Sequence, residues 1–104
     1  MNLKDKNTTE LIKVILALKN ESEVRKFLRD LMTESEIIEF SKRWQAVQML
    51  DKNISYSKIV KETGLSSTTI ARISKWLKNG TGGYRLMLNR LHHHNPTTLT
   101  KKGL

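Results

Sequence analysis

Hydrophobic residues recur along this chain with the three- and four-residue spacing of helices, and no segment alternates as a strand would. The first helix is predicted over residues 8–19, where apolar side chains surround most of the helix axis. A surface helix normally keeps a polar face, so this helix needs a partner surface to cover it. The pattern as a whole predicts an all-α protein of about six helices.

The next two helices have clear start signals. Asn20 and Glu23 form a capping box for a helix over residues 21–31. Thr33 and Glu36 form the same signal for a helix that runs to about residue 51, with Asn53 ending it. The apolar stripes of the two helices are Val24, Phe27, Leu28 and Leu31, and Ile37, Phe40, Trp44 and Val47.

Residues 56–75, which read YSKIVKETGLSSTTIARISK, predict a helix-turn-helix whose second helix continues to about residue 78. Gly64 can adopt the positive φ that a tight turn between helices often needs. Ser66 or Ser67 can cap the second helix. A small shared core is predicted from the spaced aliphatic residues Ile59, Leu65, Ile70 and Ile73.

The outward face of this second helix carries hydroxyl groups and positive charges. It consists of Ser66, Ser67, Thr68, Arg72 and Lys75. Hydroxyls can bond to base edges and phosphates, and an arginine can reach a guanine edge or a phosphate. The alternative is that these are ordinary solvated positions on an amphipathic helix. The glycine turn and the spaced aliphatics favour the DNA-binding interpretation.

Three glycines among residues 80–83 predict a bend, followed by a short last helix over residues 84–91. Residues 1–7 form a predicted flexible leader, and residues 92–104, which include the only proline, form a predicted flexible tail. The segment 8–91 is therefore expected to be one helical domain, with the helix-turn-helix at about 56–78. Its length permits only a modest core, which dimerisation would help to stabilise.

Charge divides the chain into two parts. Residues 1–40 hold seven basic and eight acidic residues, a net charge of −1, whereas residues 41–104 hold twelve and two, a net charge of +10. The excess begins close to the predicted helix-turn-helix, as expected if that part meets a polyanion and the first part meets protein. A basic surface alone could equally serve RNA or an anionic membrane.

The cellular setting is constrained by composition. The chain has no cysteine, which excludes disulfides and cysteine metal sites and gives no sign of secretion. The longest apolar run, residues 14–18, is too short to span a membrane, and the N-terminus lacks the apolar core of a signal peptide. We expect a soluble, cytoplasmic protein.

Three features resemble chemical sites without supporting one. His92, His93 and His94 could bind a transition metal weakly, but a closed site needs fixed geometry and further ligands. The carboxylates at positions 34, 36 and 39 suit the positive end of a helix dipole. The glycine bend lacks the lysine of a phosphate-binding loop. We predict no enzyme activity, no metal and no cofactor, and we expect Trp44 and Trp76 to be core residues.

The segments LMTESEIIEFSKRWQAVQML, ETGLSSTTIARISKWL and NGTGGYRLMLNRL resemble the tryptophan repressor superfamily, and specifically its YerC/YecD branch. The similarity covers roughly residues 10–91. The GTGGYR bend is the most discriminating part, because helix-turn-helix patterns alone are common. The resemblance implies an intertwined homodimer whose N-terminal helices interlock. Two recognition helices would then enter successive major grooves of a near-palindromic double-stranded DNA site.

The resemblance also implies which residues face DNA. The DNA-facing positions of the family fall on Tyr56, Ser57, Ser67, Thr68, Thr69 and Ala71. Only Thr69 keeps the residue type of the family's prototype, so the operator sequence does not transfer. Joined with the residues argued from chemistry, the predicted DNA-binding set is Tyr56, Ser57, Lys58, Ser66, Ser67, Thr68, Thr69, Arg72 and Lys75.

The prototype binds tryptophan between two arginines, which match Arg43 and Arg72 as candidate ligand-binding residues. Two other pocket positions differ: a glycine is replaced by Ile73, and a serine that helps hold the ligand's amino group is replaced by Trp76. Both side chains are expected to fill the cavity, so tryptophan should not bind in that manner. Arg43 could instead pair with Glu39 or face the phosphate backbone.

The leading hypothesis is therefore a homodimeric, sequence-specific DNA-binding transcriptional regulator. It would occupy a promoter operator and exclude polymerase, which favours repression over activation. The alternative is a protein- or RNA-interaction module that keeps the helix-turn-helix shape without reading DNA. A sensor of an unidentified effector is compatible with the first hypothesis.

Overall fold

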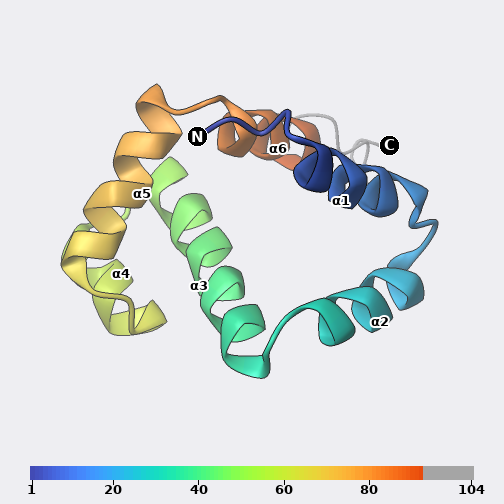
Figure 1. Ribbon diagram of the computed structural model, residues 1–104. Coiled ribbons are helices and arrows are strands. Elements are labelled where there is room, and N and C mark those ends of the chain that lie inside the picture. The colour runs from blue at the N-terminus through green and yellow to red at the C-terminus, as the bar shows by residue number, and fades with distance from the viewer. Residues whose placement is uncertain (93–104) are drawn as a thin grey trace, which may run out of the picture. The chain divides into compact units, whose positions relative to one another are not determined.

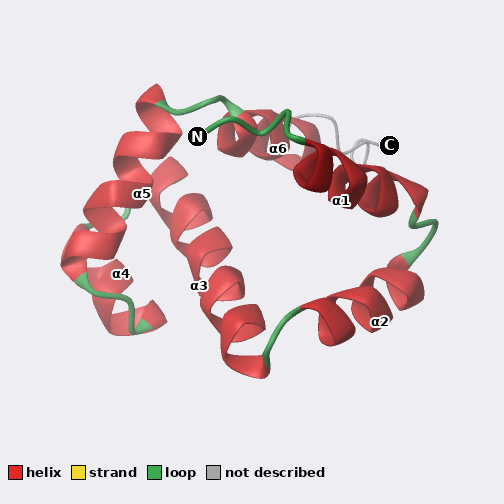
Figure 2. Ribbon diagram, in the orientation of Figure 1, coloured by secondary structure: helices red, strands yellow, loops and turns green. Residues whose placement is uncertain are grey.

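The computed structural model describes residues 1–92, and their regular secondary structure is entirely helical (Figures 1 and 2). Six helices follow one another: α1 Lys6–Ala17, α2 Glu21–Leu31, α3 Glu34–Asp51, α4 Tyr56–Thr63, α5 Ser67–Asn79 and α6 Gly83–His92. The predicted all-α class is confirmed. The predicted tail lies outside the described residues apart from His92.

The chain divides into two compact units, Met1–Ile37 and Ile38–Leu104. The first unit holds α1, α2 and the start of α3, and no residue of α1 or α2 is buried. Helix α1 begins at Lys6, inside the predicted leader, because the Asp5 carboxylate caps it by accepting the Thr8 backbone N–H at 3.1 Å. Hydrogen bonds from Thr8 also hold the pKa of Asp5 below its ordinary value.

Both predicted helix caps are present, but only the one at Thr33 is a complete capping box. The Glu23 carboxylate accepts from the Lys19 N–H at 2.9 Å and not from the Asn20 N–H. The Asn20 side chain accepts from the Glu23 N–H at 3.0 Å, which starts α2 at the predicted residue. At the start of α3, the Glu36 N–H donates to the Thr33 hydroxyl at 3.2 Å, and the Thr33 N–H donates to the Glu36 carboxylate at 2.9 Å. Two hydrogen bonds to the Glu36 carboxylate lower its pKa. The bond from the Thr33 backbone has the larger effect, and the bond from the Thr33 side chain has the smaller one.

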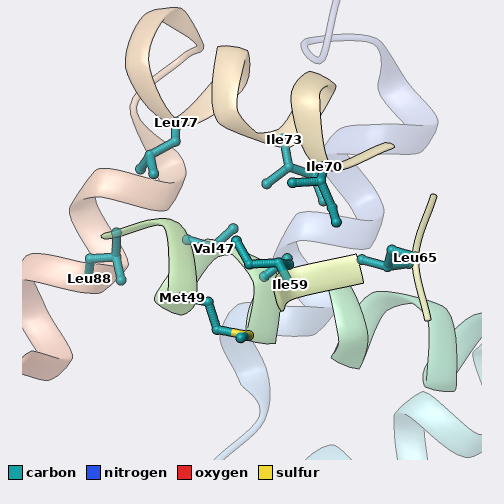
Figure 3. Close-up of a cluster of buried hydrophobic side chains, with 9 residues drawn as sticks. Val47, Met49, Ile59, Leu65, Ile70, Ile73, Leu77 and Leu88 are labelled. Atoms are coloured by element: carbon teal, nitrogen blue, oxygen red, sulfur yellow. The ribbon is translucent and has the colours of Figure 1, made fainter. Parts of the chain in front are cut away.

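The core lies in the second unit and draws on every helix there (Figure 3). The buried apolar residues are Ala46, Val47 and Met49 of α3, Ile59 of α4, Leu65 of the following turn, Ile70, Ile73 and Leu77 of α5, and Leu88 of α6. The four aliphatic residues predicted to form a helix-turn-helix core are all among them. Helices α3 and α6 complete a core that α4 and α5 could not enclose alone.

Helix α6 is fixed to the second unit by three kinds of contact. Leu88 is fully buried in the core. The Arg85 guanidinium donates to the Asp51 carboxylate at 2.9 Å, and the rings of Tyr84 and Trp44 lie 6.4 Å apart between centroids. The bend before α6 requires glycine at position 80, because a Cβ there would lie 2.4 Å from the Trp76 carbonyl oxygen. The predicted bend is confirmed.

Candidate nucleic-acid interface

The turn between α4 and α5 has the backbone geometry predicted for it. Gly64 has φ 77° and ψ 2°, and its N–H donates to the Val60 carbonyl at 2.9 Å. A Cβ at this glycine would have only the Lys42 Nζ atom within 4 Å, at an ordinary contact distance of 3.8 Å. The positive φ, rather than crowding, therefore accounts for the glycine.

Thr63 holds the turn together and was not singled out by the sequence. Its side chain is almost fully buried, donates to the Ile59 carbonyl at 2.7 Å and accepts from the Leu65 N–H at 3.1 Å. One hydroxyl thus bonds to the backbone on both sides of Gly64. The threonine immediately before that glycine is the signal that could have revealed it, because threonine readily bonds to neighbouring backbone groups.

Ser66, not Ser67, caps α5. Its hydroxyl accepts from the Thr69 N–H at 3.1 Å and also bonds to the Thr69 hydroxyl at 2.9 Å. Ser66 and Thr69 therefore have a structural task at the start of the helix in addition to the predicted role in binding. Ser67 and Thr68 stand beside this cap with exposed side chains.

The outward face of α5 lies opposite its buried stripe. Thr68, Arg72 and Lys75 follow the i, i+4, i+7 spacing and lie within roughly 60° of one another around the helix axis. All three are exposed. Among residues 1–92, the ion pairs include neither Arg72 nor Lys75. The structure thus brings a hydroxyl and two unpaired cations onto one accessible face.

The candidates on α4 are exposed but more restricted. The Lys58 Nζ atom lies 3.8 Å from the Glu62 carboxylate one turn later, an exposed pair of little energy. The Ser57 and Ser55 hydroxyls are 3.4 Å apart. Tyr56 is 43% exposed and lines a small pocket of about 240 Å³, to which Ser74 and Lys78 of α5 also contribute. Its ring therefore lies beside the second half of α5.

Arg43 makes the local contacts that its sequence position permits. Its Nε atom donates to the Glu39 carboxylate at 3.2 Å, and its guanidinium lies 5.5 Å from the centre of the Phe40 ring. Both contacts are within α3, and the arginine side chain is about one-third exposed. Of the two alternatives to ligand binding, the structure contains the ion pair with Glu39.

The two substitutions at the prototype's pocket have different outcomes. Ile73 is fully buried in the core, as expected. Trp76 is 43% exposed and, with Trp44, lines an open cleft of about 610 Å³ beside the glycine bend. The expectation that both tryptophans are core residues is correct for Trp44, which packs on the core, and wrong for Trp76. Trp76 lies roughly 60° beyond Ile73 around the axis, at the edge of the buried stripe.

Neither a metal cluster nor a membrane span is found in the part of the chain that the structure describes. Within residues 1–92, no group of three or more histidine, cysteine or acidic residues could hold a metal ion. His93 and His94 lie outside that range. No helix of the described residues is long and apolar enough to cross a membrane.

An all-helical core that carries a helix-turn-helix on its surface defines the class of this protein. The family model for the Trp repressor protein matches residues 6–92, and the chain belongs to this family. It is 36% identical over 89 residues to the YerC protein of Bacillus subtilis (strain 168), with 86% of each chain covered. The members are non-enzymatic regulators, which agrees with the absence of catalytic motifs.

Two solved structures have the same fold. A TrpR-like protein from Eubacterium eligens ATCC 27750 is 35% identical, with a TM-score of 0.81 over 86% of this chain and 92% of that one. A Staphylococcus aureus protein is also 35% identical, with a TM-score of 0.80 over 86% and 89% of the two chains. The predicted family and the predicted all-α fold of about six helices are confirmed.

Proposed function

We propose that this protein is a homodimeric, sequence-specific regulator of transcription that binds double-stranded DNA in the cytoplasm. It represses by occupying a near-palindromic operator and excluding polymerase. The observation that carries this proposal is the face of α5 formed by Thr68, Arg72 and Lys75, which is exposed and makes no ion pair within residues 1–92. An unpaired cation beside short hydroxyls suits base edges and phosphates.

The way α5 is anchored to the rest of the unit supports a role in reading DNA bases. The turn is fixed by Thr63 and Gly64, and three residues of α5, Ile70, Ile73 and Leu77, are anchored in the core. Because the backbone of α5 is already ordered, binding DNA does not have to order it. The net charge of +10 over residues 41–104 would attract the DNA backbone from a distance.

The uncovered apolar surface of α1 supports a homodimer. Leu11, Ile12, Val14, Ile15 and Leu16 are 38–78% exposed. Such a surface marks an interaction site in a soluble chain. A second copy would cover it within the proposed domain of residues 8–91 and place two recognition helices about 34 Å apart, one turn of DNA.

We also propose that the protein does not respond to tryptophan as the family's prototype does. Ile73 fills the position where the prototype needs a glycine, and its side chain is fully buried. Arg43, the match to one of the two ligand-holding arginines, is already paired with Glu39. Titration calorimetry should detect no micromolar binding of free tryptophan, and binding at that level would overturn this part of the proposal.

The experiment that tests the function is selection from a random DNA library at two salt concentrations, with the oligomeric state measured by light scattering. The proposal expects a palindromic motif bound by a dimer. Weak binding that ignores sequence and disappears at the higher salt would overturn it. A higher affinity for structured RNA would favour the alternative of an interaction module.

Two substitutions on α5 separate base reading from backbone attraction. Arg72→Ala should weaken operator binding by about 1–3 kcal/mol for each half-site and relax the preference at one base position in each half-site. Lys75→Met should weaken binding to all DNA alike. Because both protomers lose the charge, it should reduce the slope of log affinity against log salt by about 1.8. Lys58 is a poorer probe because it already pairs with Glu62. Unchanged operator affinity in Arg72→Ala would refute its reading role.

A further inference from the structure

Lys42 lies outside the helix-turn-helix, yet its ammonium reaches the turn. It belongs to α3, and its Nζ atom is 3.8 Å from the position of a Cβ on Gly64. The missing side chain of this glycine leaves the space beside the ammonium open. Three helices therefore lie close to one positive charge: α3 supplies it, α4 ends beside it, and α5 begins three residues after Gly64.

This ammonium is not neutralised within the described chain. The hydrogen bonds and ion pairs of residues 1–92 include none from Lys42 Nζ, whereas its neighbour Arg43 is paired with Glu39. The Lys42 side chain is half-buried. A stem that is already partly packed loses less freedom when its charged end binds an anion. Lys42 thus presents an unpaired cation beside the turn.

The place of this cation matters because of what lies next to it. Gly64 and Ser66, the cap of α5, are two residues apart, so their Cα atoms are separated by at most about 7 Å. Ser67 and Thr68, the exposed hydroxyls of the proposed reading face, follow at once. A DNA strand read by these residues has its phosphates within reach of a lysine at the turn.

We propose that Lys42 binds a phosphate of the DNA backbone and anchors α3 to the strand beside the start of α5. The proposal rests on the function proposed above and adds a contact from a third helix to it. Phosphate contacts fix the register of a protein on the duplex but carry no sequence information. Lys42 should therefore contribute to the affinity for DNA and not to the choice of DNA sequence.

The test compares charge-neutral variants in salt titrations of operator and unrelated DNA. Lys42→Met keeps the apolar stem and removes one contact from each protomer of the dimer. It should weaken binding to both DNAs about 60-fold near 0.1 M salt, with the salt slope reduced by about 1.8. Lys42→Gln is a second neutral variant in case the first does not fold, and Lys42→Arg should keep the wild-type slope. The selected motif should be unchanged in all three.

Lys26→Met is the matched control. It removes the same charge from an exposed position of α2, outside the helix-turn-helix. Its salt slope should equal that of the wild type. A wild-type slope in both neutral Lys42 variants would overturn the phosphate contact, as would a loss of thermal stability with the slope unchanged, which would mean that Lys42 only stabilises the end of α4. Absence of DNA selection by the wild-type protein would overturn the proposed function itself.

Discussion

The first 37 residues and the unit that follows them differ in how much of their apolar surface is buried. The second unit encloses nine buried apolar residues from α3, α4, α5, α6 and one turn. Helices α1 and α2 of the first unit bury none, although α1 is the most continuously apolar segment of the chain. The comparison teaches that apolar composition does not make a core unless the helix has neighbours on several sides.

The two regions also differ in how they use charge. In the first unit, Lys13 pairs with Glu10 and Arg25 pairs with Glu21, each within one helix. On α5, Arg72 and Lys75 are in none of the ion pairs found in residues 1–92. The first region balances its charges and buries no side chain of α1 or α2, while the second has an apolar core and exposes cations on α5. They suit different partners, a protein surface and a polyanion.

The largest expected effect is on the core of the second unit. Ile70→Ala removes a fully buried side chain between α5 and its neighbours and should lower the free energy of unfolding by about 2–5 kcal/mol. Urea denaturation measures it. Leu86→Ala, at a position that is 52% exposed, is the control and should stay within about 0.5 kcal/mol of the wild type. Equal losses in the two variants would mean that the core is not where the structure has it.

The next effect should appear in association. Ile15→Asp places a charge on the apolar surface of α1 and should raise the dimer dissociation constant at least about 100-fold, because about 1.5–3 kcal/mol per buried isoleucine is lost twice in a symmetric dimer. Light scattering over a concentration series measures it. Asn7→Asp adds the same carboxylate at an exposed polar position of α1 and should leave the dimer intact. An unchanged dimer in Ile15→Asp would show that α1 is not the interface.

The smallest effect concerns pH and the start of α3. The pKa of Glu36 is lowered from 4.5 in the folded chain, so its contribution to stability is present above pH 4.5 and is lost as the pH falls through the lowered value. Glu36→Gln should therefore lose less stability than the wild type between pH 7 and about pH 3. Thermal unfolding at the two pH values measures the difference. An identical loss in both proteins would show that the bonds with Thr33 do not favour the carboxylate.

Local signals in the sequence were reliable where a few neighbouring residues decide the structure. The Asn20 cap and the Thr33 capping box mark the starts of α2 and α3, and Gly64 marks the turn by its positive φ. The cap hydrogen bonds join residues three positions apart, and the positive φ belongs to a single residue. Neither depends on the rest of the fold. The start of α1 was placed two residues late because Asp5, an equally local cap, was not recognised.

The candidate interface was predictable in composition but not in detail. The spacing of Thr68, Arg72 and Lys75 is enough to put them on one face of a helix. The choice between Ser66 and Ser67 as the cap depended on which hydroxyl reaches the Thr69 N–H, and the structure selects Ser66. Trp76 is exposed because the helices that pack on α5 do not cover its position. The spacing of apolar residues along the sequence does not show how far those helices extend.

The sequence by itself thus determined the helices, the caps at Asn20 and Thr33, the helix-turn-helix and the concentration of positive charge in the second part of the chain. The tertiary structure decided which apolar residues form the core, that Trp76 is left exposed, and that Lys42 of α3 reaches Gly64. The physical reason is distance. Caps and periodicity act between residues a few positions apart, whereas Lys42 and Gly64 are 22 positions apart and meet only because α3 packs against the helix-turn-helix.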